Sequence, residues 1–488
     1  MQFHSTRNKE TYVSSSQAIA QGLSSEGGLF VPVSFPKADW ESWKGLDYPH
    51  LAQKVLELFL TDYDKEFLLK AAQESYGERF GGKAGYLAPV AQGTYALELW
   101  HGPTCAFKDY ALQLMPRLLV QAKKNLGATE KTLILVATSG DTGKAALDGY
   151  HDIENVEIAV FYPDHGTSEI QRLQMVTQEG SNVSVYAVNG NFDDAQTGVK
   201  KVFGDRTIQE ELAGRNIRLS SANSINWGRL VPQIVYYFAA YFQLVEKGAL
   251  TMGQKATFCV PTGNYGDILA GYYAKQMGLP VGKLICASNK NNVLTEFLET
   301  GRYNAKREFY RTSSPSMDIL VSSNLERLLY HVCGSDKKVA EYMSRLAREG
   351  EYTVSSEELT AIQADFACGC ANDVQVAQEI LHQYQDNGYL CDTHTAVAFK
   401  VAREYQEKTG DNAPMVVLST ASPFKFPGDV LEALDQTAPA DDFQAMEALE
   451  QFTGHKAPQS LACLREKPVR FTAVIDPVEI ADVALGTK

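Results

Sequence analysis

The feature that most constrains the fold is an alternation of short apolar runs with amphipathic helical stretches, beginning near Leu97. The runs lie at residues 132–137, 156–162, 184–188, 256–260, 283–287 and 415–418. Because parallel strands need a crossover connection, usually a helix, this rhythm predicts an α/β fold with a twisted, parallel sheet. Ligands bind such sheets at the carboxyl ends of the strands, where the Gly-, Ser-, Thr- and Asn-rich loops of this chain fall.

The size and charge of the chain narrow the possible functions. Its 488 residues allow two or three cores at about 100–200 residues each. The formal net charge of −14 repels phosphate backbones and predicts no nucleic-acid partner, although one electropositive pocket could still bind a small anion.

The location predicted from the sequence is cytoplasmic. No apolar run approaches the roughly 20 residues that span a bilayer, so no membrane association is expected, and the polar N-terminus lacks a signal-peptide pattern. The eight scattered cysteines show no zinc-finger or C-x-x-C spacing, which favours reduced thiols. The histidines show no metal-ligand spacing, so no metal is expected.

The segment HGPTCAFKDYA, residues 101–111, contains a candidate catalytic lysine. Lys108 follows Ala106 and Phe107 and precedes a predicted helix. Burial and the positive end of a helix would lower the pKa of its amine and make it a better nucleophile toward an aldehyde. A solvated surface lysine beside Asp109 is the alternative, and for a lone lysine it is the more common case.

Two loops could bind an anion with backbone N–H groups at a helix start. The first is ATSGDTGK, residues 137–144, which is not a nucleotide-binding P-loop because Thr138 replaces the first glycine and Ala145 follows Lys144. The second is PTGNYGDI, residues 261–268, in which Gly263 and Gly266 flank two larger residues. For each loop an ordinary strand-to-helix turn remains an alternative.

Two further polar segments follow the same pattern. In ANSINWGRLVPQ, residues 222–233, Arg229 could bind a phosphate through two hydrogen bonds, or could form a surface salt bridge. In LSTASPFKF, residues 418–426, Thr420 is a candidate hydroxyl partner for a heteroaromatic nitrogen, or part of a turn that ends a strand.

Taken together, these motifs resemble threonine synthase of the longer microbial and fungal type in both order and spacing. The resemblance covers nearly the whole chain. Besides the segments above it includes SEGGLFVP (25–32), GNFDDAQ (190–196), PSMDI (315–319) and THTAVA (393–398).

The resemblance implies a fold of the tryptophan-synthase-β type, fold type II among enzymes that use pyridoxal 5'-phosphate. It implies an N-terminal segment over residues 1–95 and a catalytic region over residues 96–488. That region would consist of a large and a small α/β domain, the small one at approximately residues 130–220.

The resemblance also implies roles for individual residues. Lys108 would bind pyridoxal 5'-phosphate covalently, Thr420 would face the ring nitrogen, and Asp141 would lie on the side of the ring hydroxyl. The residues expected to bind the cofactor phosphate are Gly263, Asn264, Tyr265, Gly266 and Asp267. The residues expected to bind the substrate phosphate are Ser139, Thr142, Asn223, Ser224 and Arg229.

The activity implied is the conversion of O-phospho-L-homoserine and water to L-threonine and phosphate, by γ-elimination and β-addition of water. Another lyase of the same fold, such as a serine/threonine dehydratase or a phospho-lyase, is an alternative, as is a catalytically silent homologue. The sequence leaves both a monomer and a homodimer open.

Overall fold

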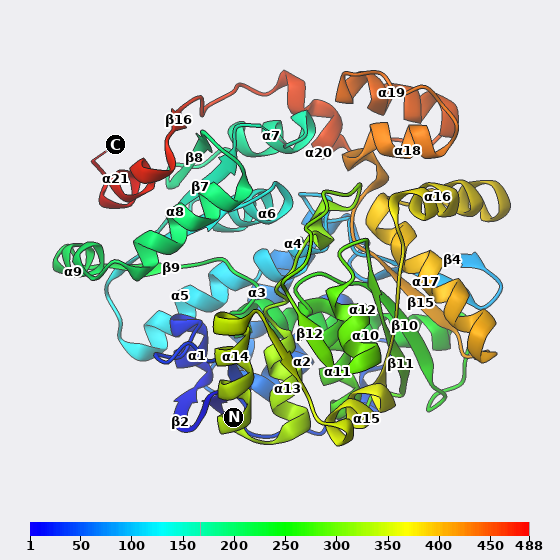
Figure 1. Cartoon of the computed structure of the whole chain (residues 1–488), viewed down its shortest axis with the longest axis horizontal. Coiled ribbons are helices and arrows are strands. Elements are labelled where there is room, and N and C mark those ends of the chain that lie inside the picture. Colours follow the sequence, from blue (N-terminus) through cyan, green and yellow to red (C-terminus); the bar gives the residue numbers. More distant parts are fainter. Residues whose placement is uncertain (166, 488) are drawn as a thin grey trace.

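The alternation of strands and helices builds two separate sheets in the computed structural model, which describes residues 1–165 and 167–487 (Figure 1). Each of the six apolar runs in the sequence forms a strand, so the predicted α/β fold is confirmed.

The larger sheet has six strands in the order β14-β11-β10-β15-β5-β4. All neighbours are parallel except β4 and β5, which form an antiparallel pair at one edge. Its strands are β4 (Tyr86–Ala91), β5 (Thr94–Glu98), β10 (Ala256–Pro261), β11 (Val281–Ser288), β14 (Phe366–Cys370) and β15 (Met415–Ser419). Strand β4 lies before the predicted domain boundary at residue 95, yet it pairs within this sheet.

The smaller sheet is entirely parallel, in the order β16-β8-β7-β6-β9. Its strands are β6 (Lys131–Ala137), β7 (Val156–Pro163), β8 (Val183–Val188), β9 (Ile217–Ser220) and β16 (Val474–Ile475). The last strand comes from the C-terminal region: after α19 (Asp442–Thr453) the chain runs back along the molecule, and α21 (Ile480–Leu485) packs on α8 (Phe192–Gly204) (Figure 1).

A long apolar helix, α10 (Trp227–Glu246), lies in the main core. Almost all of its side chains are buried, as expected for a helix that is apolar on every face. It packs against α2 (Tyr48–Phe59) and α11 (Gly266–Met277), while α17 (Thr393–Thr409) crosses β10, β11 and β15. The first turns of α10, α11 and α17 contain Arg229, Asp267 and His394, which belong to the polar segments discussed below.

The N-terminal region is joined to the catalytic region by charged contacts. It forms a three-stranded antiparallel sheet of β1 (Gln2–Ser5), β2 (Asn8–Ser14) and β3 (Phe30–Pro32). The Arg7 guanidinium donates to both carboxylate oxygens of Glu326, at 2.8 and 2.7 Å. Glu326 lies in α13 (Leu325–Cys333), a helix whose N-cap residue, Asn324, contacts two of the polar loops.

No helix in the described part of the chain is both long enough and apolar enough to cross a bilayer.

Candidate active site

Lys108 is placed by hydrogen bonds between two backbone segments. The N–H of Phe107 donates to the carbonyl of Thr420 at 2.8 Å, and the N–H of Ser422 donates to the carbonyl of Cys105 at 3.1 Å. Between them Ala106 and Ala421 form an antiparallel bridge. The lysine therefore begins helix α4 (Lys108–Leu112) directly beside the segment that follows strand β15, at the carboxyl end of the large sheet.

The Lys108 amine faces two polar groups. Its Nζ donates to Ser316 Oγ at 3.1 Å and lies 3.6 Å from Asp141 Oδ2, and 12% of the side chain is exposed. Burial lowers the pKa of this amine; Asp141 opposes the effect, and the positive charges of Lys425 and Arg229 add to it. The uncharged, nucleophilic form of Lys108 is therefore more accessible than that of an ordinary surface lysine.

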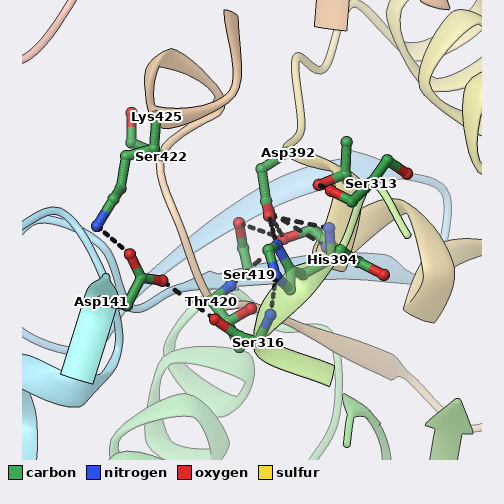
Figure 2. Close-up of polar contacts among 12 residues, drawn as sticks. Asp141, Ser313, Ser316, Asp392, His394, Ser419, Thr420, Ser422 and Lys425 are labelled. Carbon is green, nitrogen blue, oxygen red and sulfur yellow. Dashed lines mark hydrogen bonds and ion pairs between the residues drawn. The ribbon is translucent and has the colours of Figure 1, made fainter. Parts of the chain in front are cut away.

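Asp141 is a buried carboxylate with several donors. Its Oδ1 lies 2.6 Å from Lys425 Nζ and accepts from Gln171 Nε2 at 3.0 Å, and its Oδ2 accepts from Ser316 Oγ at 3.2 Å. Figure 2 shows Asp141 between Lys425 and Ser316. Burial alone would raise its pKa, but Lys425 and Lys108 outweigh burial, and the pKa lies well below its ordinary value. Asp141 is thus a fixed negative charge.

Ser316 is held by a buried histidine. It lies in the short 3-10 helix η3 (Pro315–Met317), and its backbone N–H donates to His394 Nε2 at 3.1 Å. Because that nitrogen accepts, the proton of the neutral imidazole is on Nδ1, which donates to Asp392 Oδ2 at 2.7 Å. Figure 2 shows this series of contacts from Asp392 through His394 to Ser316. It fixes the backbone of the residue whose Oγ contacts Lys108.

The loop before α11 leaves its N–H groups available. Tyr265 has φ +63°, a strained conformation for a bulky residue, and in the part of the chain that the structure describes no side chain caps the helix that follows. A Cβ on Gly263 would lie 2.8 Å from the carbonyl oxygen of Ser316, so the loop approaches the lysine site closely. An uncapped helix start of this kind can bind an anion through its backbone.

The carboxyl of Asp267 in the same loop points to two tyrosines. Its Oδ1 accepts from Tyr236 Oη at 2.6 Å and from Tyr237 Oη at 3.0 Å. Burial raises the pKa of Asp267 to about 7, although the tyrosine hydrogen bonds oppose this. The group therefore carries less negative charge near neutral pH than an exposed aspartate, which favours an anion at this helix start.

Arg229 lies in the first turn of α10, and one of its N–H donors is not used by the described residues. The side chain is 4% exposed; its Nη1 donates to the carbonyl of Ala222, and its buried Nε has no hydrogen-bond partner among the described residues. Burial lowers the pKa of Arg229 to about 10, so it remains a cation at neutral pH. A buried cation with an unused N–H is a site for an anion.

Asn324 joins the two loops. Its Nδ2 donates to the carbonyls of Ser224, at 3.3 Å, and Asn264, at 3.1 Å, and its backbone N–H donates to the latter at 3.0 Å. The predicted substrate loop and cofactor loop are therefore fixed to one residue. In addition, the Oγ of Ser322 donates to the carbonyl of Gly263 at 2.8 Å.

Among the described residues, the hydrogen bond and the ion pair of the Lys108 amine involve none of the other predicted residues. Ser139 is exposed and Thr142 half-buried at the start of α6 (Asp141–Tyr150), while Asn223 is exposed and accepts from Ser224 Oγ at 3.4 Å. The backbone of Thr420 is fixed, and its N–H donates to Thr395 Oγ1 at 3.3 Å. Their roles stay predictions.

The residues that contact the site and were given no role from the sequence include Ser316, Asn324, His394 and Lys425. Ser316, His394 and Lys425 lie within motifs that carried the resemblance, and the apolar flanks of Lys425, Phe424 and Phe426, repeat the pattern that singled out Lys108. Nothing in the local sequence distinguishes Asn324, whose importance comes from the two loops it joins.

Comparison with known proteins identifies the family. Sequence profiles match "Threonine synthase N terminus" over residues 2–76, "Pyridoxal-phosphate dependent enzyme" over 89–365 and "Threonine synthase, C-terminal" over 395–483. Threonine synthase from Pseudomonas aeruginosa is 40% identical over 489 residues, which cover 99% of this chain and 97% of that protein.

Two other relatives extend the comparison. Human "Threonine synthase-like 1" is 39% identical over 86% of this chain, which spans only 58% of that longer protein. The crystal structure of pyridoxal-phosphate-bound threonine synthase from Brucella melitensis superimposes with a TM-score of 0.89 at 36% identity, covering 100% of this chain and 99% of that one. The chain therefore belongs to the threonine synthase family of pyridoxal-phosphate-dependent, fold-type-II enzymes.

Proposed function

We propose that this chain converts O-phospho-L-homoserine and water to L-threonine and phosphate, with pyridoxal phosphate bound to Lys108. The family supports the reaction. The observation that carries the choice of a phosphorylated substrate is the buried Arg229, whose Nε has no partner among the described residues. A purely apolar amino-acid pocket would not need a cation with an unused donor.

The site fits the cofactor in three respects. Lys108 presents a buried amine for the aldehyde, the uncapped start of α11 presents N–H groups for the phosphate, and Asp141 provides a fixed negative charge beside the lysine. We assign the phosphate to the backbone of Gly263, Asn264, Tyr265, Gly266 and Asp267. Thr420 would meet the ring nitrogen through its hydroxyl, and Asp141 would lie on the ring hydroxyl side.

Lys108 would also move protons. When bound, pyridoxal phosphate stabilises negative charge that develops on the substrate carbons. Burial lowers the pKa of the Lys108 amine, so this amine can accept the α-proton of the substrate and return a proton later in the same site. Ser316 Oγ, 3.1 Å from Nζ, would keep the amine aimed during this exchange.

The substrate phosphate would bind between α6 and α10. Arg229 would supply the charge, and the side chains of Ser139, Thr142, Asn223 and Ser224 would supply further hydrogen bonds. Asn324 keeps this loop at a fixed position relative to the cofactor loop. Such positioning of the leaving group contributes directly to rate.

The remaining assignments concern organisation and location. We propose that residues 1–95 form an N-terminal segment and that residues of about 130–220 form the small domain of the catalytic region. Closing this domain on the large one would exclude water from reactive species. All eight cysteines are free, which supports a cytoplasmic location.

The proposal is tested by product stoichiometry. Purified protein with pyridoxal phosphate and O-phospho-L-homoserine should release threonine and phosphate in equal amounts, and Lys108→Ala should release neither. A keto acid with ammonia as the main product would instead indicate a dehydratase of the same fold. No turnover of any amino-acid substrate by cofactor-loaded protein would indicate a silent homologue.

A further inference from the structure

We propose that Lys425 is a positioning residue that occupies one oxygen of Asp141, so that the carboxylate does not take Lys108 as its main ion-pair partner and the Lys108 amine is free to react. This inference rests on the proposed function, because it concerns the lysine assigned there to the cofactor. Lys425 is buried, and the proposed reaction assigns it no other role.

The geometry shows which amine holds the carboxylate. The side chain of Lys425, at the end of the 3-10 helix η4 (Pro423–Lys425), has no exposed surface. Its Nζ lies 2.6 Å from Asp141 Oδ1 and donates to the carbonyl of Thr104 at 3.2 Å. Lys108 Nζ lies 3.6 Å from the other oxygen, beyond hydrogen-bond distance. Asp141 is thus paired primarily with Lys425 (Figure 2).

Ser316 separates Lys108 from Asp141. Its Oγ accepts from Lys108 Nζ at 3.1 Å and donates to Asp141 Oδ2 at 3.2 Å. The hydroxyl therefore uses its proton on the carboxylate and offers a lone pair to the amine. The nearest partner of the Lys108 amine is thus a neutral acceptor at 3.1 Å, and its ion pair with Asp141 is longer, at 3.6 Å.

Burial and two nearby cations favour the neutral form of Lys108, whereas Asp141 favours its ammonium form. Asp141 faces Lys108 from α6, Lys425 from η4 and Arg229 from α10. His394 from α17 faces Asp141, but its Nε2 accepts the Ser316 N–H, so the imidazole is neutral. One carboxylate thus faces two other cations, and a third positive charge on Lys108 in this buried space is costly. The lowered pKa of Lys108 agrees with this arrangement.

Removing Lys425 should change which amine pairs with Asp141. In Lys425→Met the carboxylate would lose its nearer cation and turn to Lys108, whose ammonium form would gain an ion-pair partner. In Lys425→Arg the cation is kept. The two substitutions therefore separate charge from packing.

The test follows capture of pyridoxal phosphate by the apoprotein between pH 6 and 10. In this step the neutral Lys108 amine adds to the aldehyde carbon, and the carbonyl oxygen leaves as water. The rate is read from absorbance, and the attachment point from borohydride reduction and peptide mapping. Lys425→Met should capture the cofactor about tenfold more slowly below pH 8 and converge on the wild-type rate at high pH, because one pKa unit is a tenfold change in neutral amine.

Lys400→Met is the matched control. Lys400 is also buried; its Nζ donates to the carbonyl of Cys370 at 2.9 Å and to Glu404 at 2.6 Å. Lys400→Met should leave the pH profile of cofactor capture as in the wild type, and so should Lys425→Arg. A Lys425→Met protein that is equally slow at every pH, or unchanged at every pH, would overturn the proposal.

A second variant, Asp141→Asn, tests the same proposal if Lys425→Met does not fold. Asp141→Asn removes the carboxylate that favours the Lys108 ammonium and should therefore move the profile to lower pH. An unmoved profile would overturn the proposal. Capture needs no amino-acid substrate. A shifted profile in a protein that makes no threonine would therefore support this inference while contradicting the proposed function.

Discussion

Two buried arginines near the site, Arg229 and Arg327, differ in how completely their donors are used. Burial lowers the pKa of each to about 10. Arg327 donates from Nε to the carbonyl of Phe30 at 2.9 Å, from Nη1 to Asn324 Oδ1 and from Nη2 to the carbonyl of Ile225. Among the described residues, the guanidinium of Arg229 donates only to the carbonyl of Ala222, and its Nε has no partner.

These hydrogen bonds indicate that Arg327 is a structural residue and that Arg229 can bind a ligand. Arg327 links the N-terminal region, α13 and the loop before α10 with all three of its nitrogens. Since buried donors are nearly always satisfied, the unused Nε of Arg229 indicates a partner that comes from outside the chain. Burial and residue type alone would not have distinguished them.

The largest expected effect is on catalysis by Arg229→Ala. The ratio kcat/KM for O-phospho-L-homoserine should fall on the order of 10³-fold, about 4 kcal/mol, because a buried charge-assisted contact to the phosphate is lost. Dehydration of serine, which has no phosphate, should fall much less. Steady-state kinetics with both substrates measure this, and equal losses would mean that Arg229 is structural.

Arg327→Leu should act mainly on stability. Removing the guanidinium leaves Asn324 Oδ1 and two carbonyls without their donor, at a cost of about 3 kcal/mol in the free energy of unfolding. Urea unfolding of the apoprotein measures it, with Arg229→Ala as the comparison. If Arg229→Ala were the less stable protein, the two assignments would have to be exchanged.

Asp267 is the acidic counterpart of Arg229, because its buried Oδ2 also has no hydrogen-bond partner among the described residues. Its pKa rises from 3.8 to about 7 on folding, so its contribution to stability is full below pH 4 and is lost as the pH rises through 7. Between pH 5 and 7 wild-type apoprotein should lose about 2 kcal/mol relative to Asp267→Asn. Parallel curves of unfolding free energy against pH would contradict this.

The smallest effect is expected from Asn324→Ala. This change removes the amide that joins the carbonyls of Ser224 and Asn264, about 1 kcal/mol for each hydrogen bond. Because both loops depend on Asn324, the cofactor concentration at half-saturation and the KM for the substrate should rise together, each about fivefold. A change in only one would show that the loops are held independently.

Much of the fold could be predicted from local sequence. Every strand predicted from an apolar run is present, because a buried parallel strand must be apolar throughout. Strand β14 (FACGC) was missed because it is short, carries a glycine and is only partly apolar, and β16 because it has two residues. Such strands are defined by the neighbours they pair with.

The candidate site was predictable only in its loops. Glycines and a helix start indicate where backbone donors can lie, and they pointed to the segments around Lys108, Asp141 and Gly263. The partners Ser316, Asn324 and Lys425 are brought in from segments far apart in the chain. Their contacts depend on tertiary packing, which no local pattern records.

The most direct test of the proposed function is to determine which lysine binds the cofactor covalently. The protein would be loaded with pyridoxal phosphate, reduced with borohydride, digested and mapped by mass spectrometry, with Lys108→Ala alongside. We expect a pyridoxyl group on Lys108 in the wild type and none in the variant. A label on Lys425 or Lys144, or an equal label in Lys108→Ala, would contradict it.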